Sequence, residues 1–321
     1  MTRPHIHTIH HQPISTQHYG WDNSLPPQLR AAPGDTLDFA IQDASGGQIN
    51  EHSTAADVLN FDFSRTNPVN GPVYIEGAEP GDVLSVEVLD FQESPGSGSS
   101  SAWGWTGILP GFGLLAADFP NPWLHISRYD REKVVFTPEI TLPTRPFTGT
   151  IGLAPAEPGL HSVVPPRRVG GNLDIHDLTR GAKLYLPVEV PGALFSVGDT
   201  HACQGDGEVC GTAVETAMNV QLKFGLLKGA NYSAPRFELP GSSVATVGSK
   251  GYYATTGLGP DLYVAAQDAI RAMIDHLGRE YRLDAPLAYA LCSVAVDLKI
   301  SEIVDAPNWV VSAYLPRGIF G

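Results

Sequence analysis

Residues 198–217, which read GDTHACQGDGEVCGTAVETA, gather many side chains that can bind a metal or move a proton. The segment holds one histidine, two aspartates, two glutamates and two cysteines, separated by four glycines. The pattern up to His201 predicts a strand, which would point Asp199 and His201 to the same face. The glycines predict a turn, so the returning segment would bring Glu208 or Glu215 beside that pair. One imidazole with two or three carboxylates is a ligand set suited to zinc or another divalent ion at a hydrolytic site.

A second acidic cluster precedes this segment. Residues 170–178 read GGNLDIHDL and contain Asp174, His176 and Asp177. The Gly-Gly-Asn start predicts a tight turn that holds Asp174 in a fixed place, although the same acidic residues could simply cap a helix.

Two other functions fit the same residues. Cys203 or Cys210 could act as a nucleophile with His201 as its base, but the neighbouring carboxylates raise the pKa of a thiol and disfavour the thiolate. Both cysteines could also be small core residues.

A protein that binds calcium without catalysis is the other alternative. Calcium prefers a shell of about six to eight oxygen ligands, and His201 at the centre of the cluster counts against it.

The composition narrows the class of protein. The 321 residues carry 20 Lys and Arg against 34 Asp and Glu, a net charge of −14. An acidic chain without a basic run is not expected to bind nucleic acid. Three cysteines (Cys203, Cys210 and Cys292) do not suggest a disulfide framework. The N-terminal stretch is polar, and no apolar run approaches the roughly 20 residues that span a bilayer. We therefore expect a cytoplasmic protein without membrane contact.

Structure breakers and alternating stretches indicate the fold that must position the cluster. Gly and Pro number 34 and 27 and are spread along the whole chain, which is typical of many short strands joined by turns. Residues 92–107 are rich in Ser and Gly and predict a flexible surface loop. Strands are expected within 33–43, 71–91, 132–159, 182–202 and 208–224.

The clearest helix is expected at residues 261–277, where Asp261 is the N-cap and Gly278 the stop. A second helix is expected to begin near Asp284. Strands followed by helices predict a mainly β (α+β) fold, in which sheets pack face to face as a sandwich with a few peripheral helices towards the C-terminus. We expect a mobile N-terminal segment over 1–17 and a single domain over 18–321; if that domain has two lobes, they meet near 145–170.

From about residue 18 to the end, the chain resembles the acetamidase/formamidase family. Its motifs occur in the family's order, and a collinear series is more specific than any one motif. The matching stretches are GPVYIEGAEPGDVLSVEVLDF, TGTIGLAPAEPG, PPRRVGGNLD, GGNLDIHDLTRGAKLYLPVEVPGALFSVGD, GDTHACQGDGEVCGTAVE and LCSVAVDLKISEIVDAPNWVVSAYLP.

The resemblance implies a mainly β fold and the hydrolysis of a short linear amide to a carboxylate and ammonia. It also implies a metal-supported site and a homo-oligomer, either a dimer or a trimer. Some relatives act on lactams, so a lactam-hydrolysing enzyme stays open. Trp103, Trp105, Phe112 and Trp123 could line the substrate pocket or belong to the core.

The resemblance also implies which residues form the site. By motif they are Asp174, Asp199, His201 and Glu208, with Glu215 and His18 as second choices. The metal, zinc first and calcium as an alternative, would be held by Asp199, His201 and a further ligand, Glu215 or His18. The catalytic groups would be Glu208 as the proton acceptor, Asp174 and Glu215.

Overall fold

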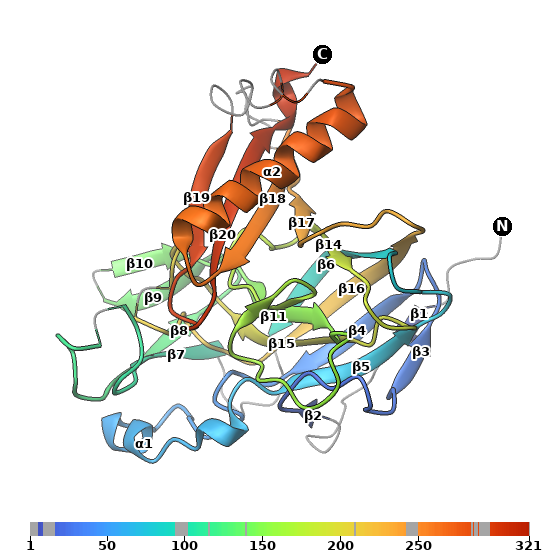
Figure 1. The fold of residues 1–321 in the computed structure, drawn as a ribbon. Coiled ribbons are helices and arrows are strands. Elements are labelled where there is room, and N and C mark those ends of the chain that lie inside the picture. The colour runs from blue at the N-terminus through green and yellow to red at the C-terminus, as the bar shows by residue number, and fades with distance from the viewer. Residues whose placement is uncertain are drawn as a thin grey trace.

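Antiparallel strands are the main regular structure of the described residues, with one long helix near the C-terminal end (Figure 1). This mainly β architecture confirms the predicted fold class. The computed structural model describes residues 6–8, 17–93, 102–114, 116–138, 140–208, 210–241, 250–283, 285, 288 and 296–320.

The largest sheet contains nine strands within the described residues and runs the length of the molecule. Its first two strands pair in parallel, and the others pair antiparallel. In spatial order the strands are β1 (Ile6–Thr8), β4 (Thr36–Ile41), β16 (Met218–Leu227), β6 (Val83–Glu93), β14 (Lys183–Pro187), β17 (Arg236–Glu238), β18 (Tyr252–Gly259), β20 (Trp309–Pro316) and β19 (Asp297–Glu302).

Two further sheets complete the described β structure. One has the order β10 (Ile140–Pro143), β9 (Lys133–Thr137), β8 (Trp123–Tyr129) and β7 (Ala102–Ile108). The other has the order β12 (Pro166–Arg167), β13 (Gly170–Asn172), β11 (Phe147–Leu153), β15 (Phe195–His201), β5 (Val69–Ile75) and β2 (Gln17–His18), with β3 (Leu29–Ala31) also pairing with β5.

The core lies between the large sheet and the sheet that contains β15. The ring of Phe195 on β15 packs edge-on against Phe39 of β4 and Phe224 of β16, with ring centroids 5.8 and 4.9 Å apart. These side chains are almost fully buried, so their removal from water stabilises the face-to-face packing. The predicted sandwich of packed sheets is therefore present.

The alternation of apolar and polar residues correctly predicted the burial pattern of strand β16. Met218, Val220, Leu222 and Phe224 are buried on one face, while the residues between them are half-buried or exposed, as period-two spacing requires. The strand begins only at Met218, however, and not at residue 208 as predicted. The preceding residues form turns and isolated bridges, because their backbone bonds are used to shape the site described below.

The predicted surface loop over 92–107 is wrong at both ends. Strand β6 continues to Glu93, and β7 begins at Ala102, so Trp103 and Trp105 lie in a strand paired with β8. Aromatic residues favour strands, and the Ser and Gly content of the neighbouring residues concealed this preference. Residues 94–101 lie outside the described residues.

Helix α2 (Leu262–Tyr281) covers β18 and β20. Asp261 is its N-cap, as predicted, and its carboxylate accepts hydrogen bonds from the N–H groups of Tyr263 and Val264. The helix continues past Gly278 and ends at Arg282, which has a left-handed conformation with φ of 57°. A single internal glycine costs only about 1 kcal/mol, and the stacking of Tyr281 on Phe320 offsets it, so the predicted end was one turn too early.

The remaining predictions fall partly outside the described residues. Strand β1 belongs to the N-terminal stretch expected to be mobile, whereas 1–5 and 9–16 are not described. The second predicted helix, near Asp284, also lies largely outside the described residues. The short helical segments are α1 (Ala55–Leu59), η2 (Phe63–Arg65) and η4 (Arg317–Ile319).

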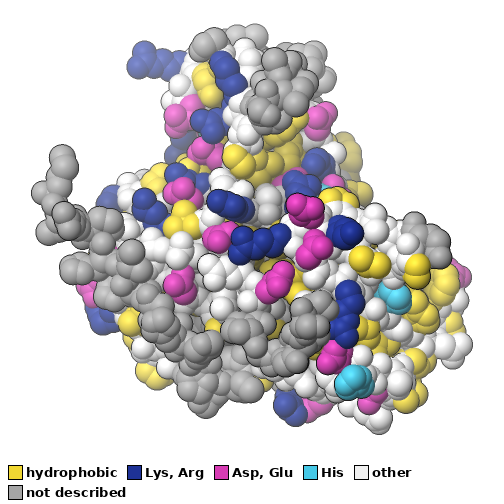
Figure 2. Space-filling view, turned by 180° about the vertical axis from the view of Figure 1, so that it is seen from behind, with side chains coloured by type: hydrophobic (Ala, Val, Ile, Leu, Met, Phe, Trp, Pro, Cys, Tyr) yellow, Lys and Arg dark blue, Asp and Glu magenta, His cyan; other side chains and the backbone are white. Residues whose placement is uncertain are grey.

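No helix among the described residues is long and apolar enough to cross a bilayer. On the face drawn in Figure 2, Lys and Arg side chains are interspersed with Asp and Glu rather than gathered in one area.

Candidate active site

Strand β15 supplies the centre of the site. Asp199 and His201 are its last buried residues, and the return segment meets them at Glu215. Glu215 forms isolated antiparallel bridges with His201 on one side and with Trp105 of β7 on the other. The backbone groups of Glu215 and Trp105 exchange hydrogen bonds of 2.8 and 2.9 Å. The expected approach of the return segment is therefore confirmed at Glu215, which is held between two sheets.

His201 stands between two pairs of carboxylates. Its Nε2 lies 3.0 Å from Asp199 Oδ1 and 3.0 Å from Glu215 Oε2, and its Nδ1 lies 4.0 Å from Asp174 Oδ1. The ring packs edge-on against Phe147 with centroids 4.8 Å apart and is 1% exposed. Ligand atoms of two groups lie within 4.8 Å of one another: Asp174, His201 and Glu208, and Asp199, His201 and Glu215.

Segments outside the strands bring Asp174 and Glu208 to this point. Asp174 follows β13 with φ of 47°, and its N–H donates to the carbonyl of Gly149 at 3.2 Å. Glu208 also has φ of 47°, and the N–H of the preceding Gly207 donates to the carbonyl of Ser301 at 3.0 Å. Left-handed backbone is costly for residues other than glycine and is concentrated at functional sites. The tight turn predicted at Gly170–Asn172 is wrong, because these residues form strand β13, and Asp174 lies in the irregular segment that follows the strand.

The carboxylates can approach one another only because residue 149 is a glycine. A Cβ there would lie 2.4 Å from Asp174 Oδ1, 2.7 Å from Asp199 Oδ2 and 2.9 Å from His201 Cε1. Such contacts are shorter than atoms tolerate, so any side chain at this position of β11 would push the cluster apart.

The charges of the cluster are not balanced by protein groups. Burial raises the pKa values of Asp174 and Glu208 well above their usual range and that of Glu215 to about 7. Burial also opposes ionisation of Asp199, but His201 outweighs it and lowers the Asp199 pKa. Burial disfavours the charged form of His201 as well, yet Glu215 and Asp199 raise its pKa well above the usual value. One imidazolium cannot neutralise these carboxylates, so the site favours a further proton or a cation.

Several polar atoms at the centre lack a protein partner. Among the described residues, no N–H or alcohol group donates a hydrogen bond to the Asp174 carboxylate, whose side-chain neighbour is the carboxyl group of Asp305, and His201 Nδ1 has no hydrogen-bond partner. Buried polar groups are nearly always satisfied. The donor set of carboxylate oxygens and one imidazole nitrogen therefore fits a divalent ion such as zinc.

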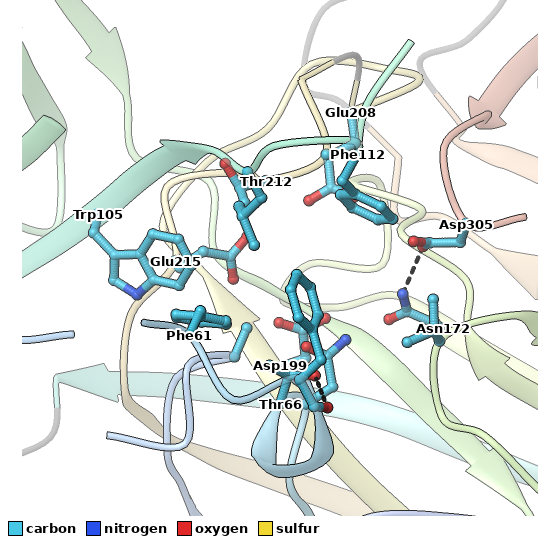
Figure 3. Close-up of a pocket in the computed structure, with 16 residues that line it drawn as sticks. Phe61, Thr66, Trp105, Phe112, Asn172, Asp199, Glu208, Thr212, Glu215 and Asp305 are labelled. Atoms are coloured by element: carbon cyan, nitrogen blue, oxygen red, sulfur yellow. Dashed lines mark hydrogen bonds between the residues drawn. The ribbon is translucent and has the colours of Figure 1, made fainter. Parts of the chain in front are cut away.

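Two important residues were not identified from the sequence. The side chain of Asn172 donates to Asp305 Oδ2 at 2.6 Å and accepts a hydrogen bond from Thr150 (Figure 3). Asp305 is held in turn by Glu302, whose Oε1 accepts from the Asp305 N–H at 2.6 Å. Asn172 belongs to the GGNLD stretch and Asp305 to the final matched stretch, but nothing local marks either as part of a site formed with β15.

A cavity of about 190 Å³ opens onto the cluster. The polar side chains of Asp199, Glu208, Glu215, Asp305 and Asn172 meet apolar ones in its wall (Figure 3). The apolar residues are Ala44, Phe61, Phe63, Trp105, Leu109, Phe112 and Val164.

The predicted pocket aromatics divide into two pairs. Trp105 and Phe112 line the cavity, as expected. Trp103 packs half-buried against the cluster around Trp105. Trp123 is 42% exposed and stacks on His125, so neither of these tryptophans is a lining residue.

His18 is in neither ligand group and does not line the cavity. Its two ring nitrogens lie 2.7 Å from the carbonyl oxygen of Gly20 and 2.9 Å from Ser196 Oγ. Strand β2, which carries it, pairs with β5 and not with β15, and burial lowers the pKa of His18. The described structure thus gives His18 a neutral, hydrogen-bonded environment apart from the cluster.

Neither described cysteine is placed as a nucleophile. Cys203 is buried, which raises the pKa of its thiol to about 11, so it is not ionised at neutral pH. The Sγ of Cys210 lies 3.4 Å from the carbonyl oxygen of Thr212, and neither residue lines the cavity. Cys292 lies outside the described residues.

Comparisons with known proteins all identify the same family. The profile of the Acetamidase/Formamidase family matches residues 6–163 and 156–321. A formamidase from Methylophilus methylotrophus is 28% identical over 377 aligned positions, covering 94% of this chain and 89% of that protein.

Solved structures are similar over nearly the whole chain. The crystal structure of an acetamidase from Yersinia enterocolitica has a TM-score of 0.87 and 30% identity, covering 100% of this chain and 94% of that one. The crystal structure of an acetamidase from Bacillus halodurans has a TM-score of 0.85 and 32% identity, covering 95% and 97%.

Proposed function

The chain belongs to the acetamidase/formamidase family, and we propose on this premise that its buried acid and histidine cluster hydrolyses short linear amides with the help of a divalent metal ion, zinc by preference. Membership of the family and the named relatives make the protein a hydrolase of carbon–nitrogen bonds in linear amides. In this reaction one water adds to a primary amide, a C–O bond forms, the C–N bond breaks, and carboxylate and ammonia leave.

The metal proposal rests on the unpartnered atoms of one of the two ligand groups, the one formed by Asp174, His201 and Glu208. Asp174 offers two carboxylate oxygens without donors, and His201 offers Nδ1. Glu208 completes the group and also lines the cavity, so an ion held there would be next to bound substrate. When bound, the ion would supply Lewis acidity that polarises the amide carbonyl and acidifies a water molecule.

Asp199 and Glu215 would then orient His201. With the proton on Nε2, the imidazole donates to Asp199 Oδ1 at 3.0 Å and has Glu215 Oε2 at the same distance, which leaves the Nδ1 lone pair free for the ion. Carboxylates commonly fix the tautomer of a metal-binding histidine in this way. This assignment differs from the sequence-based one, which placed Asp199 and Glu215 among the ligands.

Glu215 is the proposed proton acceptor. It lines the cavity, and its Oε1 is fixed by the N–H of Ala213 at 2.7 Å, so Oε2 faces the cluster. It would take a proton from the attacking water and pass it to the nitrogen that leaves, because an amine is a far better leaving group than an amide anion. If Asp199, His201 and Glu215 held the ion instead, Glu208 would take this role.

The first test is ammonia release from formamide, acetamide and a small lactam, before and after removal of metal with a chelator. We expect release from the linear amides that disappears on chelation and returns with zinc. Release that survives complete removal of metal would contradict the metal part of the proposal. Release from none of the three amides by the metal-loaded protein would contradict the amidase assignment itself.

Variants separate the two ligand groups. Asp174→Asn should lose bound zinc, measured per chain, whereas Glu215→Gln should retain zinc and lose turnover by about 10²- to 10⁴-fold. Asp206→Asn is the matched control, because Asp206 lies on the same turn as Glu208 but pairs with His176. Normal zinc content in Asp174→Asn with loss in Glu215→Gln would favour the Asp199 group as the ligands.

A further inference from the structure

The apolar side of the cavity is larger than the smallest amides need. Phe61, Phe63, Phe112 and Trp105 line the cavity together with the carboxylates. Figure 3 shows Trp105 and Phe61 beside Glu215 and Phe112 beside Glu208, around one shared space. The acyl carbon of formamide carries only a hydrogen, and that of acetamide only a methyl group. Neither would fill the space between these rings and the carboxylates.

The volume of the cavity indicates the size of the acyl group that would fill it. It measures about 190 Å³, and an apolar cavity of roughly 150 Å³ is known to accept benzene. A ring-sized acyl group would fill the space between the aromatic side chains and leave the amide at the carboxylates. A substrate with a methyl group would leave a void there and forgo the dispersion contacts of a packed wall.

The charge of the wall excludes acidic acyl groups. Among the described lining residues there are four carboxylates, Asp199, Glu208, Glu215 and Asp305, and no Lys, Arg or His. A second carboxylate on the acyl group would meet these carboxylates without a Lys, Arg or His side chain of the wall to pair with.

From these observations we propose that the preferred substrate is a primary amide whose acyl group is uncharged, apolar and about the size of a six-membered ring. The inference rests on the proposed function and names the substrate class of that site. The ring lies against Phe61, Phe112 and Trp105, and the carboxamide lies at Glu208 and Glu215. Binding of the ring holds the carbonyl carbon in place for attack by water.

The test compares kcat/KM for acetamide, isobutyramide and cyclohexanecarboxamide. These amides carry alkyl groups on the carbonyl, so differences among them report mainly on the pocket. We expect kcat/KM to rise along the series, with cyclohexanecarboxamide at least about tenfold above acetamide, since each well-packed methylene contributes a factor of this order or more. Succinamate, which carries a carboxylate, should be at least about tenfold worse than isobutyramide.

Two variants locate the effect. Ala44→Leu would reduce the cavity from its wall, and it should lower kcat/KM for cyclohexanecarboxamide at least about tenfold more than it lowers kcat/KM for acetamide. Phe112→Ala should also act mainly on the ring amide. Ala266→Leu is the control, because Ala266 is half-buried on α2 and not in the cavity wall.

The outcomes distinguish the two proposals. Activity that falls from acetamide to cyclohexanecarboxamide would overturn the inference and leave the amidase assignment intact, and so would equal losses for both amides in Ala44→Leu. A faster reaction with succinamate would overturn the charge argument. No turnover of any amide by the metal-loaded protein would contradict the proposed function instead.

Discussion

Two buried histidines in this protein have opposite environments. His201 is 1% exposed, and the carboxylates of Glu215 and Asp199 raise its pKa well above the usual value although burial opposes this. His276, on α2, is 7% exposed and stacks on Tyr253 with ring centroids 3.5 Å apart. Burial and the neighbouring Arg236 lower the pKa of His276 to about 4, although Asp275 acts in the opposite direction.

The difference shows how a functional region can be told from a structural one. Around His276 the charges are balanced locally, because Arg236 pairs with Asp275 at 2.8 Å and packs over the ring of Tyr232. Around His201 the carboxylates outnumber the cations, and atoms of Asp174 and His201 lack partners. Burial of unbalanced charge is destabilising, and this imbalance is the observation that supports the proposed metal ion.

Replacing each histidine by glutamine gives the largest contrast. We expect His201→Gln to lower kcat/KM for acetamide at least about a thousandfold, because it removes the imidazole that both candidate ligand groups share. His276→Gln should change the same constant less than about twofold. Circular dichroism of both variants controls for folding. Comparable activity losses in two folded variants would refute the distinction between the regions.

The next largest expected effect is the pH dependence of folding stability that His276 causes. The folded-state pKa of His276 is about 4, below the unfolded value of about 6.5. The stability that depends on neutral His276 is therefore fully present above pH 6.5 and is lost as the pH falls towards 4. Between pH 7.5 and 4.5 the wild type should lose about 2–3 kcal/mol more of unfolding free energy than His276→Phe, measured in urea. Identical pH profiles for the two proteins would show that His276 is not held neutral.

Gly257 and Gly149 each lie where another part of the chain approaches the backbone closely, so the two positions can be compared by mutation. A Cβ at Gly257 would lie 1.8 Å from the carbonyl oxygen of Ala265 on α2, and one at Gly149 would lie 2.4 Å from Asp174 Oδ1. Gly257→Ala should destabilise the protein by about 1–3 kcal/mol and leave kcat/KM of the folded fraction unchanged. Gly149→Ala should destabilise it by a similar amount and also lower kcat/KM.

Thermal unfolding and acetamide hydrolysis, measured in parallel, check both glycine variants. Full activity in folded Gly149→Ala would mean that the carboxylates need not lie as close as the structure shows. Loss of activity in folded Gly257→Ala would mean that α2 contributes to the site.

The smallest expected effect is the loss of the α2 cap. The Asp261 carboxylate accepts from the N–H groups of Tyr263 and Val264 at 2.8 and 3.0 Å. Asp261→Ala should cost about 1 kcal/mol of unfolding free energy with no change in activity, whereas Asp261→Asn should retain most of the stability. A change in KM in either variant would connect this region to the site after all.

Local patterns were enough to predict elements whose environment repeats along the chain. The period-two burial of β16 and the capped start of α2 follow from side-chain spacing, which the amino-acid order specifies directly. The placement of Asp199, His201 and Glu215 also follows, since one short turn region returns the chain to the strand. Trp103 and Trp105 in β7 and the end of α2 beyond Gly278 could not be predicted in this way, because pairing with β8 and packing against Phe320 override local preference.

The sequence by itself thus determined the mainly β fold class and most of the residues of the acidic cluster, because short-range geometry brings those residues together. Only the tertiary structure decided that Gly149, Asn172 and Asp305 complete the site and that His18 stands apart. Asn172 and Asp305 are 133 positions apart in the chain yet share a hydrogen bond. Contacts of this kind arise when separate strands and turns pack together, and no local pattern specifies them.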